Sequence, residues 1–250
     1  MIHEVARVLI RTENMSKSYK LGDERKEAVR SLDIRIMQGE FVVFEGLKGN
    51  QKNAFFNVFG CLERPDAGKY YFDYEDIALA KEDMLDKIRK NKIGYLFRNF
   101  NLVNRLTAAE NIEVPMHELN ISLQEKRNRL VEALKSLDIE QFAGEKVSAL
   151  SDFNKQLVSL ARAIVNNPLM IIADEPAANL NSKEEHRLME HLSRLNGKGV
   201  TIMLYTSKKT VKAFCGYRRI SFENGMLSED KEEYKHSLLR REDLYENCSI

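Results

Sequence analysis

An apolar run that ends in two acids and a proline, from Met170 to Pro176, constrains the fold more than any other stretch of this chain. Such a run is typical of a buried parallel strand, which delivers its last residues to the edge of a sheet. The first acid, Asp174, is suited to hold a magnesium ion, usually through water, and the second, Glu175, to polarise an attacking water. The segment therefore predicts an α/β protein with a nucleotide site at a strand end.

A second segment has the spacing of a phosphate loop without its chemistry. Residues 46–53 follow the apolar strand 41–44 and precede a helix, at the spacing G-x-x-x-x-G-K-[ST]. Gln51 stands where the motif has glycine, and Asn53 where it has a hydroxyl. Two interpretations are open at this point. The loop binds phosphate weakly, since any helix N-terminus favours anions, or it is a plain strand–turn–helix connection with no ligand.

Composition limits the kind of protein. The chain has 250 residues, enough for one large domain with a subdomain, and a formal net charge of +1, which gives no sign of a nucleic-acid partner. Its cysteines, Cys61, Cys215 and Cys248, lie far apart and are interpreted as reduced thiols of a cytosolic protein. No apolar run approaches the about 18 residues of a spanning helix, and no signal peptide is recognised.

The pattern along the chain is α/β with β-rich ends. We expect short strands within 5–45 with a loop near 21–26, then a helix, a turn and a strand through 70–72. Residues 107–148 are mostly helical and interrupted near Pro115, with a capping box from Ser122 to Glu125. The rest predicts a helix from Ser151, strand 169–173, helix 182–195, strand 200–205, and a charged tail over 228–250 that is a peripheral helix or disordered.

Taken together, these landmarks resemble the ATP-binding subunits of ABC transporters, most of all the lipoprotein-release and macrolide-export type. Matching phrases occur in order along the chain, among them residues 14–19, 60–65, 100–102, 105–108 and 161–168. The resemblance implies a P-loop NTPase-like ABC ATPase fold with a mixed core sheet, an antiparallel β subdomain and an inserted α-helical subdomain at about 98–165. Residues 1–227 would form this single domain.

The resemblance also implies ligands and partners. ATP and Mg would be the cofactors, a transmembrane permease and a second ABC ATPase subunit the partners, and the inner face of the cell membrane the location of a cytoplasmic protein. The residues implied are Tyr19 as adenine platform, Gly46, Gly49, Lys52, Asn53 and Ala54 in the phosphate loop, Ser151 in the signature, Asp174 and Asn53 for Mg, and Glu175 as the catalytic acid.

Several of these positions depart from the family pattern. If position 51 needs the left-handed conformation of the family's glycine, Gln51 costs about 1–2 kcal/mol. Lys52 still offers a point charge, whereas Asn53 is an imperfect magnesium ligand and Ala54 removes a second hydroxyl.

The signature Leu-Ser-Gly-Gly-Gln is replaced by residues 150–154, Leu-Ser-Asp-Phe-Asn. Asp152 disfavours an anion, since two unit charges about 4 Å apart repel by roughly 4 kcal/mol at an effective dielectric of 20. Phe153 adds bulk where the family's backbone approaches phosphate closely. A plain alternative explains Asp152 as an acid that stabilises the start of a helix.

Three further aligned positions have changed. Arg98 stands at the coupling glutamine and cannot be a neutral metal ligand, and Ser207 is too short to replace the switch histidine. Asn181 at the D-loop aspartate is a milder change. His186 and His191, on the following helix, are expected to be solvated residues and not substitutes.

In the family each ATP lies between the phosphate loop of one subunit and the signature of the other, so this chain would impair both sites of a homodimer or heterodimer. The first hypothesis is therefore a degenerate pseudo-ATPase subunit bound to a permease, with weak or absent ATP binding and hydrolysis. The alternative is a slow but active ABC ATPase that powers export of a lipoprotein, peptide or drug. A third interpretation, a protein acting on DNA or ribosomes, is disfavoured by the near-neutral charge.

Overall fold

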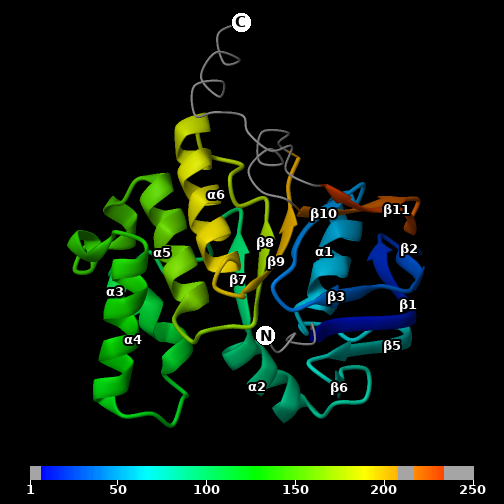
Figure 1. The fold of residues 1–250 in the computed structure, drawn as a ribbon, viewed down its shortest axis with the longest axis horizontal. Helices are drawn as coiled ribbons and strands as arrows, with labels where there is room; N and C mark the ends of the chain where they lie inside the picture. The colour runs from blue at the N-terminus through cyan, green and yellow to red at the C-terminus, as the bar shows by residue number, and fades with distance from the viewer. Residues whose placement is uncertain (1–6, 208–216, 234–250) are drawn as a thin grey trace, which may run out of the picture.

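The computed structural model describes residues 7–207 and 217–233 of the chain (Figure 1). The strands are β1 (Val8–Leu21), β2 (Glu24–Leu32), β3 (Arg35–Met37), β4 (Phe41–Glu45), β5 (Ala67–Phe72), β6 (Glu75–Asp76), β7 (Ile93–Phe97), β8 (Met170–Asp174), β9 (Thr201–Tyr205), β10 (Tyr217–Glu223) and β11 (Met226–Glu233). The α-helices are α1 (Gly49–Phe59), α2 (Glu82–Lys92), α3 (Ala108–Glu113), α4 (Leu123–Ser136), α5 (Asp152–Ile164) and α6 (Ser182–Asn196). Short 3-10 helices are η1 (Val114–Met116), η2 (Glu140–Phe142) and η3 (Val147–Ala149).

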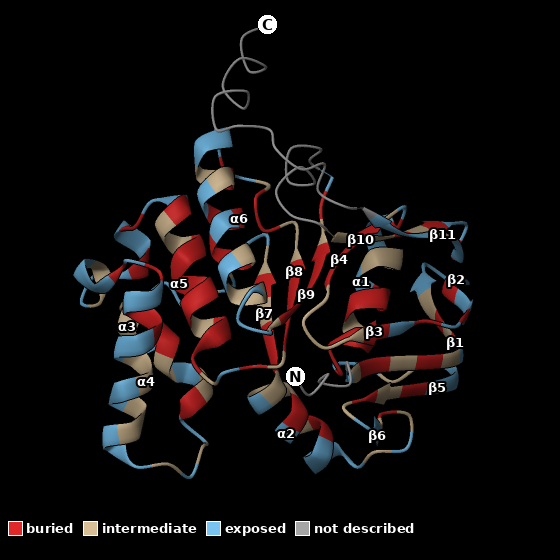
Figure 2. Ribbon diagram, in the orientation of Figure 1, coloured by how far each residue is buried: buried red, intermediate tan, exposed pale blue. Residues whose placement is uncertain are grey.

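A mixed sheet forms the centre of the molecule, in the order β11-β10-β4-β9-β8-β7. The strands from β10 to β7 are parallel, and β11 pairs antiparallel with β10. The first four residues of both β4 and β8 are buried, because helices or a second sheet cover each face of the central sheet (Figure 2). The predicted strands 41–44, 169–173 and 200–205 are thereby confirmed.

A second, antiparallel sheet lies beside the first, in the order β2-β1-β5-β6 with β3 paired to β1. Its β1 and β2 form a hairpin in which Leu21 pairs with Glu24. The loop expected over 21–26 is therefore wrong: the strands continue to a tight turn, which Gly22 permits with a φ of 63°.

Helix α1 lies between the two sheets, and its apolar stripe is the centre of one buried cluster. Phe55 and Phe59 stack with ring centroids 4.4 Å apart, and Phe44 of β4 lies 5.1 Å from Phe55. These aromatic contacts fix α1, and with it the loop that precedes the helix, against the carboxyl end of β4.

The helical layer, α3 to α5, covers the other side of the central sheet (Figure 1). Its apolar residues belong to the same buried cluster as residues of β4, β8 and β9, so these helices have no core separate from the sheet. Ser151 and Ser122 accept hydrogen bonds as N-caps of α5 and α4, but a complete capping box is found at Thr107–Glu110 and Asn181–Glu184 instead of at Ser122.

The predicted boundary before a charged tail at residue 228 is wrong, because β11 runs through Glu233. Its charged side chains pair across the strands: Arg218 of β10 contacts Asp230 at 2.7 Å, and Arg219 contacts Glu229 at 2.9 Å. Cross-strand ion pairs let an edge strand consist largely of charged residues. The remainder of the predicted tail, residues 234–250, lies outside the described residues.

Within residues 7–207 and 217–233, no helix has both the length and the apolar character that crossing a membrane requires.

Candidate nucleotide-binding site

The register of the central sheet places the candidate residues in one row at its carboxyl edge. Tyr205, the last residue of β9, pairs with Phe44 of β4 on one side and with Asp174 of β8 on the other, and Asp174 pairs with Phe97 of β7. Carboxyl ends of parallel strands are where α/β sheets bind ligands. The two segments that the sequence analysis singled out therefore flank β9 at the same edge.

The loop between β4 and α1 keeps the backbone that its glycines dictate. Gly46 has a φ of 81°, and a Cβ atom there would lie 1.9 Å from the carbonyl oxygen of Phe222, so no other residue fits. Gly49 opens α1 with a φ of 48°, and Lys48 before it provides no side-chain cap. The start of α1 therefore has no side-chain cap from Lys48, and the N–H of Gln51 donates to the carbonyl oxygen of Lys48 at 3.0 Å.

Gln51 does not carry the strain expected of a side chain in place of the third glycine. Residue 51 lies in the first turn of α1 and has no positive φ, so the left-handed conformation on which that cost depended is not adopted. Its side-chain amide instead donates to the carbonyl oxygen of Ala28 in β2, at 2.9 Å. The substitution therefore ties the helix start to the antiparallel sheet.

Lys52 reaches from α1 across β9 to the acid of β8. Its ammonium contacts Asp174 Oδ1 at 2.5 Å, and the two side chains are 16% and 20% exposed. On the way the ammonium lies 5.2 Å from the ring centroid of Tyr205, within reach of a cation–π interaction. The predicted lysine and magnesium ligand are brought together, in contact with each other.

Glu175 follows in a left-handed conformation, with a φ of 48°. Its carboxylate accepts a hydrogen bond from the backbone N–H of Ser207 at 3.1 Å and one from the Ser207 hydroxyl at 3.3 Å. Its own N–H donates to the carbonyl oxygen of Tyr205 at 2.9 Å. A left-handed backbone costs a non-glycine residue about 1–3 kcal/mol of stability, and residues held in this conformation cluster at functional sites. Ser207, at the switch position, thus donates its hydrogen bonds to Glu175, the predicted catalytic acid.

Tyr205 is one of the residues of this site that could not be found from the sequence. Its hydroxyl donates to the carbonyl oxygen of Leu47 in the phosphate loop, at 2.5 Å. Burial raises the pKa of Tyr205, and the carboxylates of Glu175, Asp174 and Glu45 raise it further, so the phenol keeps its proton at neutral pH. The sequence signal for Tyr205 is its position as the last residue of an apolar strand. This position indicates a site residue only once β9 is known to lie between β4 and β8.

A pocket of about 470 Å³ lies between the β1–β2 hairpin and one face of α1. Tyr19, Lys20 and Arg25 line it from the hairpin, and Asn50 and Asn53 from the helix. An aromatic ring beside cations and amides suits a nucleoside and its polar edges. Tyr19, Asn53 and Ala54 therefore lie in one pocket, and their roles towards a nucleotide stay predictions. Lys20, Arg25 and Asn50 were missed because their approach depends on how the hairpin folds over α1.

The signature segment lies at the N-terminus of α5, in the helical layer. Ser151 Oγ accepts from the N–H of Asn154 at 3.2 Å, and Asp152 is exposed, with Lys155 at 3.5 Å. Phe153 points into the core, where it is 5% exposed and Arg187 lies 4.8 Å from its ring centroid. The expectation that Phe153 adds bulk on a phosphate-facing surface is therefore wrong; its aromatic side chain is part of the packing between α5 and α6.

The remaining aligned positions are scattered around this edge. Arg98 is exposed just after β7, and Asn181 caps α6. The side chain of His186 is solvated as expected, with Glu190 at 3.4 Å. His191 is 4% exposed, so its predicted solvation is wrong: it lies on the inner face of α6, where burial lowers its pKa.

Asp174 and Asn53 are the residues at this edge that would hold magnesium. Among the described residues no three His, Cys, Asp or Glu side chains converge on a point where a metal ion would bind. Mg²⁺ usually keeps several waters and binds through one or two carboxylates together with substrate phosphates, and here the carboxylate of Asp174 contacts Lys52. No step of a reaction is assigned to a metal ion.

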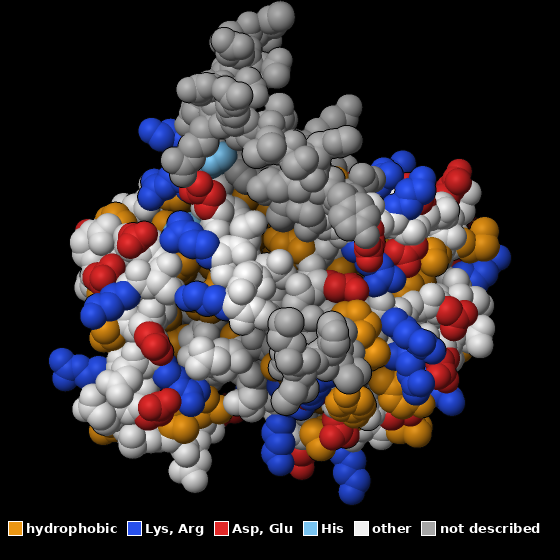
Figure 3. All heavy atoms as spheres, in the orientation of Figure 1, with side chains coloured by type: hydrophobic (Ala, Val, Ile, Leu, Met, Phe, Trp, Pro, Cys, Tyr) orange, Lys and Arg blue, Asp and Glu red, His pale blue; other side chains and the backbone are white. Residues whose placement is uncertain are grey.

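Charges of both signs are interspersed on the face shown in Figure 3, as the near-neutral net charge suggests.

These features together define the ABC ATPase fold. A phosphate-type loop lies opposite an acidic strand end, on a mixed sheet that is flanked by an antiparallel sheet and a helical layer.

Comparison with known proteins agrees with this class. The model of the ABC transporter family matches residues 29–178. The chain is 37% identical over 228 residues to the ABC transporter ATP-binding protein MJ0796 of Methanocaldococcus jannaschii, which covers 89% of this chain and 97% of that protein. It is 34% identical to the macrolide export ATP-binding/permease protein MacB of Syntrophobacter fumaroxidans, and covers 31% of the length of that protein.

A solved dimeric structure of a post-hydrolysis state of the MJ0796 cassette, bound to ADP and Pi, superposes with a TM-score of 0.79 at 36% identity, covering 89% of this chain and 98% of the cassette. The chain therefore belongs to the ABC transporter family, as an ATP-binding subunit related to MJ0796 and MacB.

Proposed function

We propose that this chain is a degenerate ATP-binding subunit of a bacterial ABC transporter, which binds nucleotide weakly or not at all and hydrolyses ATP slowly or not at all. The observation that carries the proposal is that each retained catalytic group contacts another protein group. Lys52 contacts Asp174, and the carboxylate of Glu175 accepts hydrogen bonds from the N–H and the hydroxyl of Ser207. A nucleotide would have to displace these contacts before it gained its own.

Electrostatics supports the same conclusion. Three carboxylates, those of Glu175, Asp174 and Glu45, act on the phenol of Tyr205, while Lys52 is the ammonium that lies over its ring. A polyphosphate that came near these carboxylates would be repelled by them, and it would compete with Asp174 for the ammonium of Lys52. The exposed carboxylate of Asp152 would act in the same direction at the start of α5.

The partners follow from the family. MacB joins an ATP-binding part and a permease in one chain, and the MJ0796 cassette is dimeric with ADP and Pi. We propose that the present chain docks on a separate transmembrane permease at the inner face of the cell membrane, as a homodimer or with a second ABC ATPase subunit. Its role there would be that of a scaffold or regulator, and nucleic acid is not a proposed partner.

Titration calorimetry of the purified chain with Mg-ATP tests the nucleotide claim, together with a steady-state measurement of phosphate release. We expect a dissociation constant weaker than roughly 100 μM, about −5.5 kcal/mol. We also expect phosphate release no faster than that of Glu175→Gln, which preserves shape and removes the carboxylate charge. Glu190→Gln, on the exposed face of α6, is the matched control for loss of one carboxylate.

Two results would contradict the proposal. Binding clearly tighter than 100 μM would mean that Lys52 exchanges Asp174 for phosphate readily. Phosphate release that falls tenfold or more in Glu175→Gln but not in Glu190→Gln would identify a working general base, and the slow but active exporter ATPase would then be correct.

A further inference from the structure

Tyr205 contacts the phosphate loop, Lys52 and Glu175 at once. Its hydroxyl donates to the carbonyl oxygen of Leu47 at 2.5 Å, its ring centroid lies 5.2 Å from the ammonium of Lys52, and its carbonyl oxygen accepts from the N–H of Glu175 at 2.9 Å. The side chain is partly buried and lies edge-on to Phe56 of α1, with ring centroids 6.1 Å apart. One residue thus joins the loop, the lysine and the acid of the candidate site.

The sheet order explains this position. β9 lies between β4 and β8, and strands are spaced about 4.8 Å apart, so a side chain that runs from α1 to Asp174 must cross β9 (Figure 1). The last side chain of β9 is the surface that it crosses. A tyrosine there offers Lys52 a π-face and offers the loop a hydrogen-bond donor, and a small aliphatic residue would offer neither.

We propose that Tyr205 is a positioning residue that holds the phosphate loop and Lys52 in an arrangement closed to the phosphates of a nucleoside di- or triphosphate. The inference rests on the proposed function and explains what opposes nucleotide in a chain that keeps Lys52, Asp174 and Glu175. The loop and the lysine are held by a side chain of the protein where a bound phosphate would otherwise order them.

The contacts that a phosphate must replace indicate whether Tyr205 lowers or raises the affinity for a nucleotide. Lys52 is fixed between a carboxylate and a ring, and the ammonium has to leave at least one of them to reach a phosphate oxygen. The loop carbonyl of Leu47 is fixed by the phenol, so the loop rearranges around a ligand only after that hydrogen bond breaks. Both contacts compete with a phosphate, so loss of either favours the phosphate-bound arrangement.

The test is Tyr205→Phe, which keeps the ring and removes the hydroxyl. The matched control is Tyr70→Phe, because the hydroxyl of Tyr70 also donates to a backbone carbonyl, that of Phe59 at 2.8 Å, but in the antiparallel sheet and away from the site. Amide hydrogen exchange over residues 46–53 reports the loop, and titration calorimetry of the full chain with Mg-ADP reports affinity. We expect faster exchange and a three- to tenfold higher affinity in Tyr205→Phe, and neither change in Tyr70→Phe.

A purely structural role would lower the melting temperature of both variants without raising affinity in either. Unchanged loop exchange in Tyr205→Phe would overturn the inference, and so would faster exchange with equal or weaker Mg-ADP binding. If the unaltered chain gives no heat with Mg-ADP, the inference requires that Tyr205→Phe binds measurably, and no heat in both would also overturn it.

These outcomes are separate from those that decide the proposed function. Efficient ATP hydrolysis by the unaltered chain would refute the degenerate assignment and leave the loop-exchange result as it stands. Failure of the Tyr205→Phe result, with slow hydrolysis preserved, would refute the role of Tyr205 alone.

Discussion

Glu175 combines an ordinary acidic side chain with a left-handed backbone conformation that most non-glycine residues avoid. Its φ of 48° costs an L-residue about 1–2 kcal/mol, whereas glycine accepts it freely. Glu175→Ala and Glu175→Gly both lose the contacts with Ser207, so the two variants differ mainly in backbone energy. We expect the glycine variant to be more stable than the alanine variant by about 1 kcal/mol in urea unfolding.

The control for this comparison is Glu190, an exposed residue inside α6. There the order must reverse, since glycine in a helix costs about 1 kcal/mol relative to alanine. If alanine is the more stable variant at both positions, the left-handed conformation of Glu175 is not a source of strain in the folded protein.

Residue chemistry was predictable where the partner is local and unpredictable where it is distant. The helix expected from Ser151 is α5, which Ser151 caps through its hydrogen bond with Asn154 in the first turn. The roles of Gln51 and Phe153 were misjudged because their contacts, Ala28 and Arg187, come from segments 23 and 34 residues away. A pattern that predicts a helix does not say which residues of other elements its side chains will meet.

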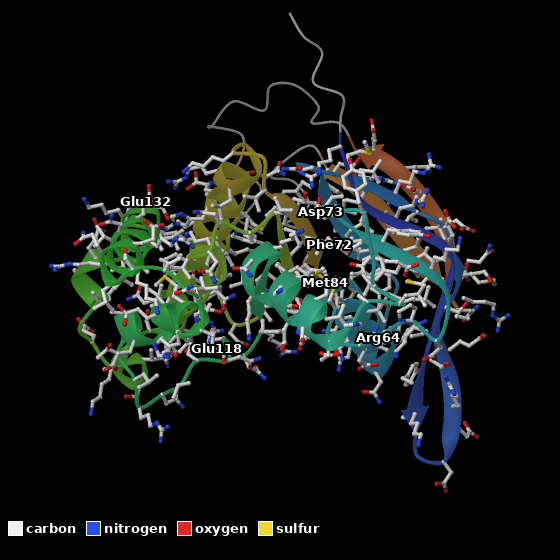
Figure 4. The ribbon with its side chains drawn as sticks, turned by 90° about the horizontal axis from the view of Figure 1, so that it is seen from below. Arg64, Phe72, Asp73, Met84, Glu118 and Glu132 are labelled. Carbon is white, nitrogen blue, oxygen red and sulfur yellow. The ribbon has the colours of Figure 1, made fainter. Side chains whose placement is uncertain are left out.

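At the scale of elements, the turn after α1 is held to the β1–β2 hairpin by one carboxylate. Asp66 accepts hydrogen bonds from the N–H of Ser18 at 2.8 Å, from its hydroxyl at 2.7 Å and from Arg25 at 2.7 Å. Arg64 in the same turn, labelled in Figure 4, donates to carbonyl oxygens of Ile77 and Ala78 ahead of α2. The turn thus joins the nucleotide-side hairpin to the segment before α2.

This arrangement predicts a pH dependence of stability. Burial acts to raise the pKa of Asp66, but the hydrogen bonds from Ser18 and Arg25 outweigh it and lower that pKa from 3.8 to about 2. Because the folded-state pKa is depressed, the contribution of Asp66 is complete above about pH 4 and is lost as the pH falls towards 2. We expect Asp66→Asn to lower the free energy of unfolding by about 1–2 kcal/mol at pH 7, after allowance for partial exposure.

Urea unfolding at pH 7, 5, 4 and 3 measures the effect. The difference between Asp66→Asn and the unaltered chain must narrow below about pH 4, while Asp23→Asn in the exposed hairpin turn should stay within about 0.5 kcal/mol throughout. A difference that is constant with pH would mean that the carboxylate charge of Asp66 contributes nothing.

At the scale of the whole molecule, the fold class was predictable because apolar strands alternate with amphipathic helices and the family resemblance spans separated segments. The order of the strands could not be predicted from these patterns, and it decides that Tyr205 lies beneath Lys52 and that Arg218 and Arg219 meet the acids of β11. Helix α2 was also missed, since Leu85 and Ile88 are its buried residues and charged neighbours hide that short stripe. Long-range pairing is the information that a local pattern lacks.

At the same scale, we propose that the segment over residues 101–113 forms the surface that contacts the permease. This segment leads from β7 into the helical layer and is held rigid from within. Asn111 accepts from the N–H of Val103 at 2.7 Å and donates to its carbonyl oxygen at 3.1 Å, and Arg162 donates to Asn101 at 2.6 Å. Rigid backbone with exposed Val103 and Arg105 is suited to contact a partner.

Reversal of one charge tests this surface. We expect Arg105→Glu to reduce recruitment of the chain to vesicles that contain the permease by about tenfold or more, 1.4 kcal/mol, because a like charge would then face the partner. Thermal unfolding should not change, since Arg105 is exposed. Arg127→Glu on the exposed side of α4 makes the same change of charge elsewhere in the helical layer and should leave recruitment intact. Equal losses in both variants would indicate attraction to the membrane surface by net charge, and no loss in Arg105→Glu would show that the permease docks elsewhere.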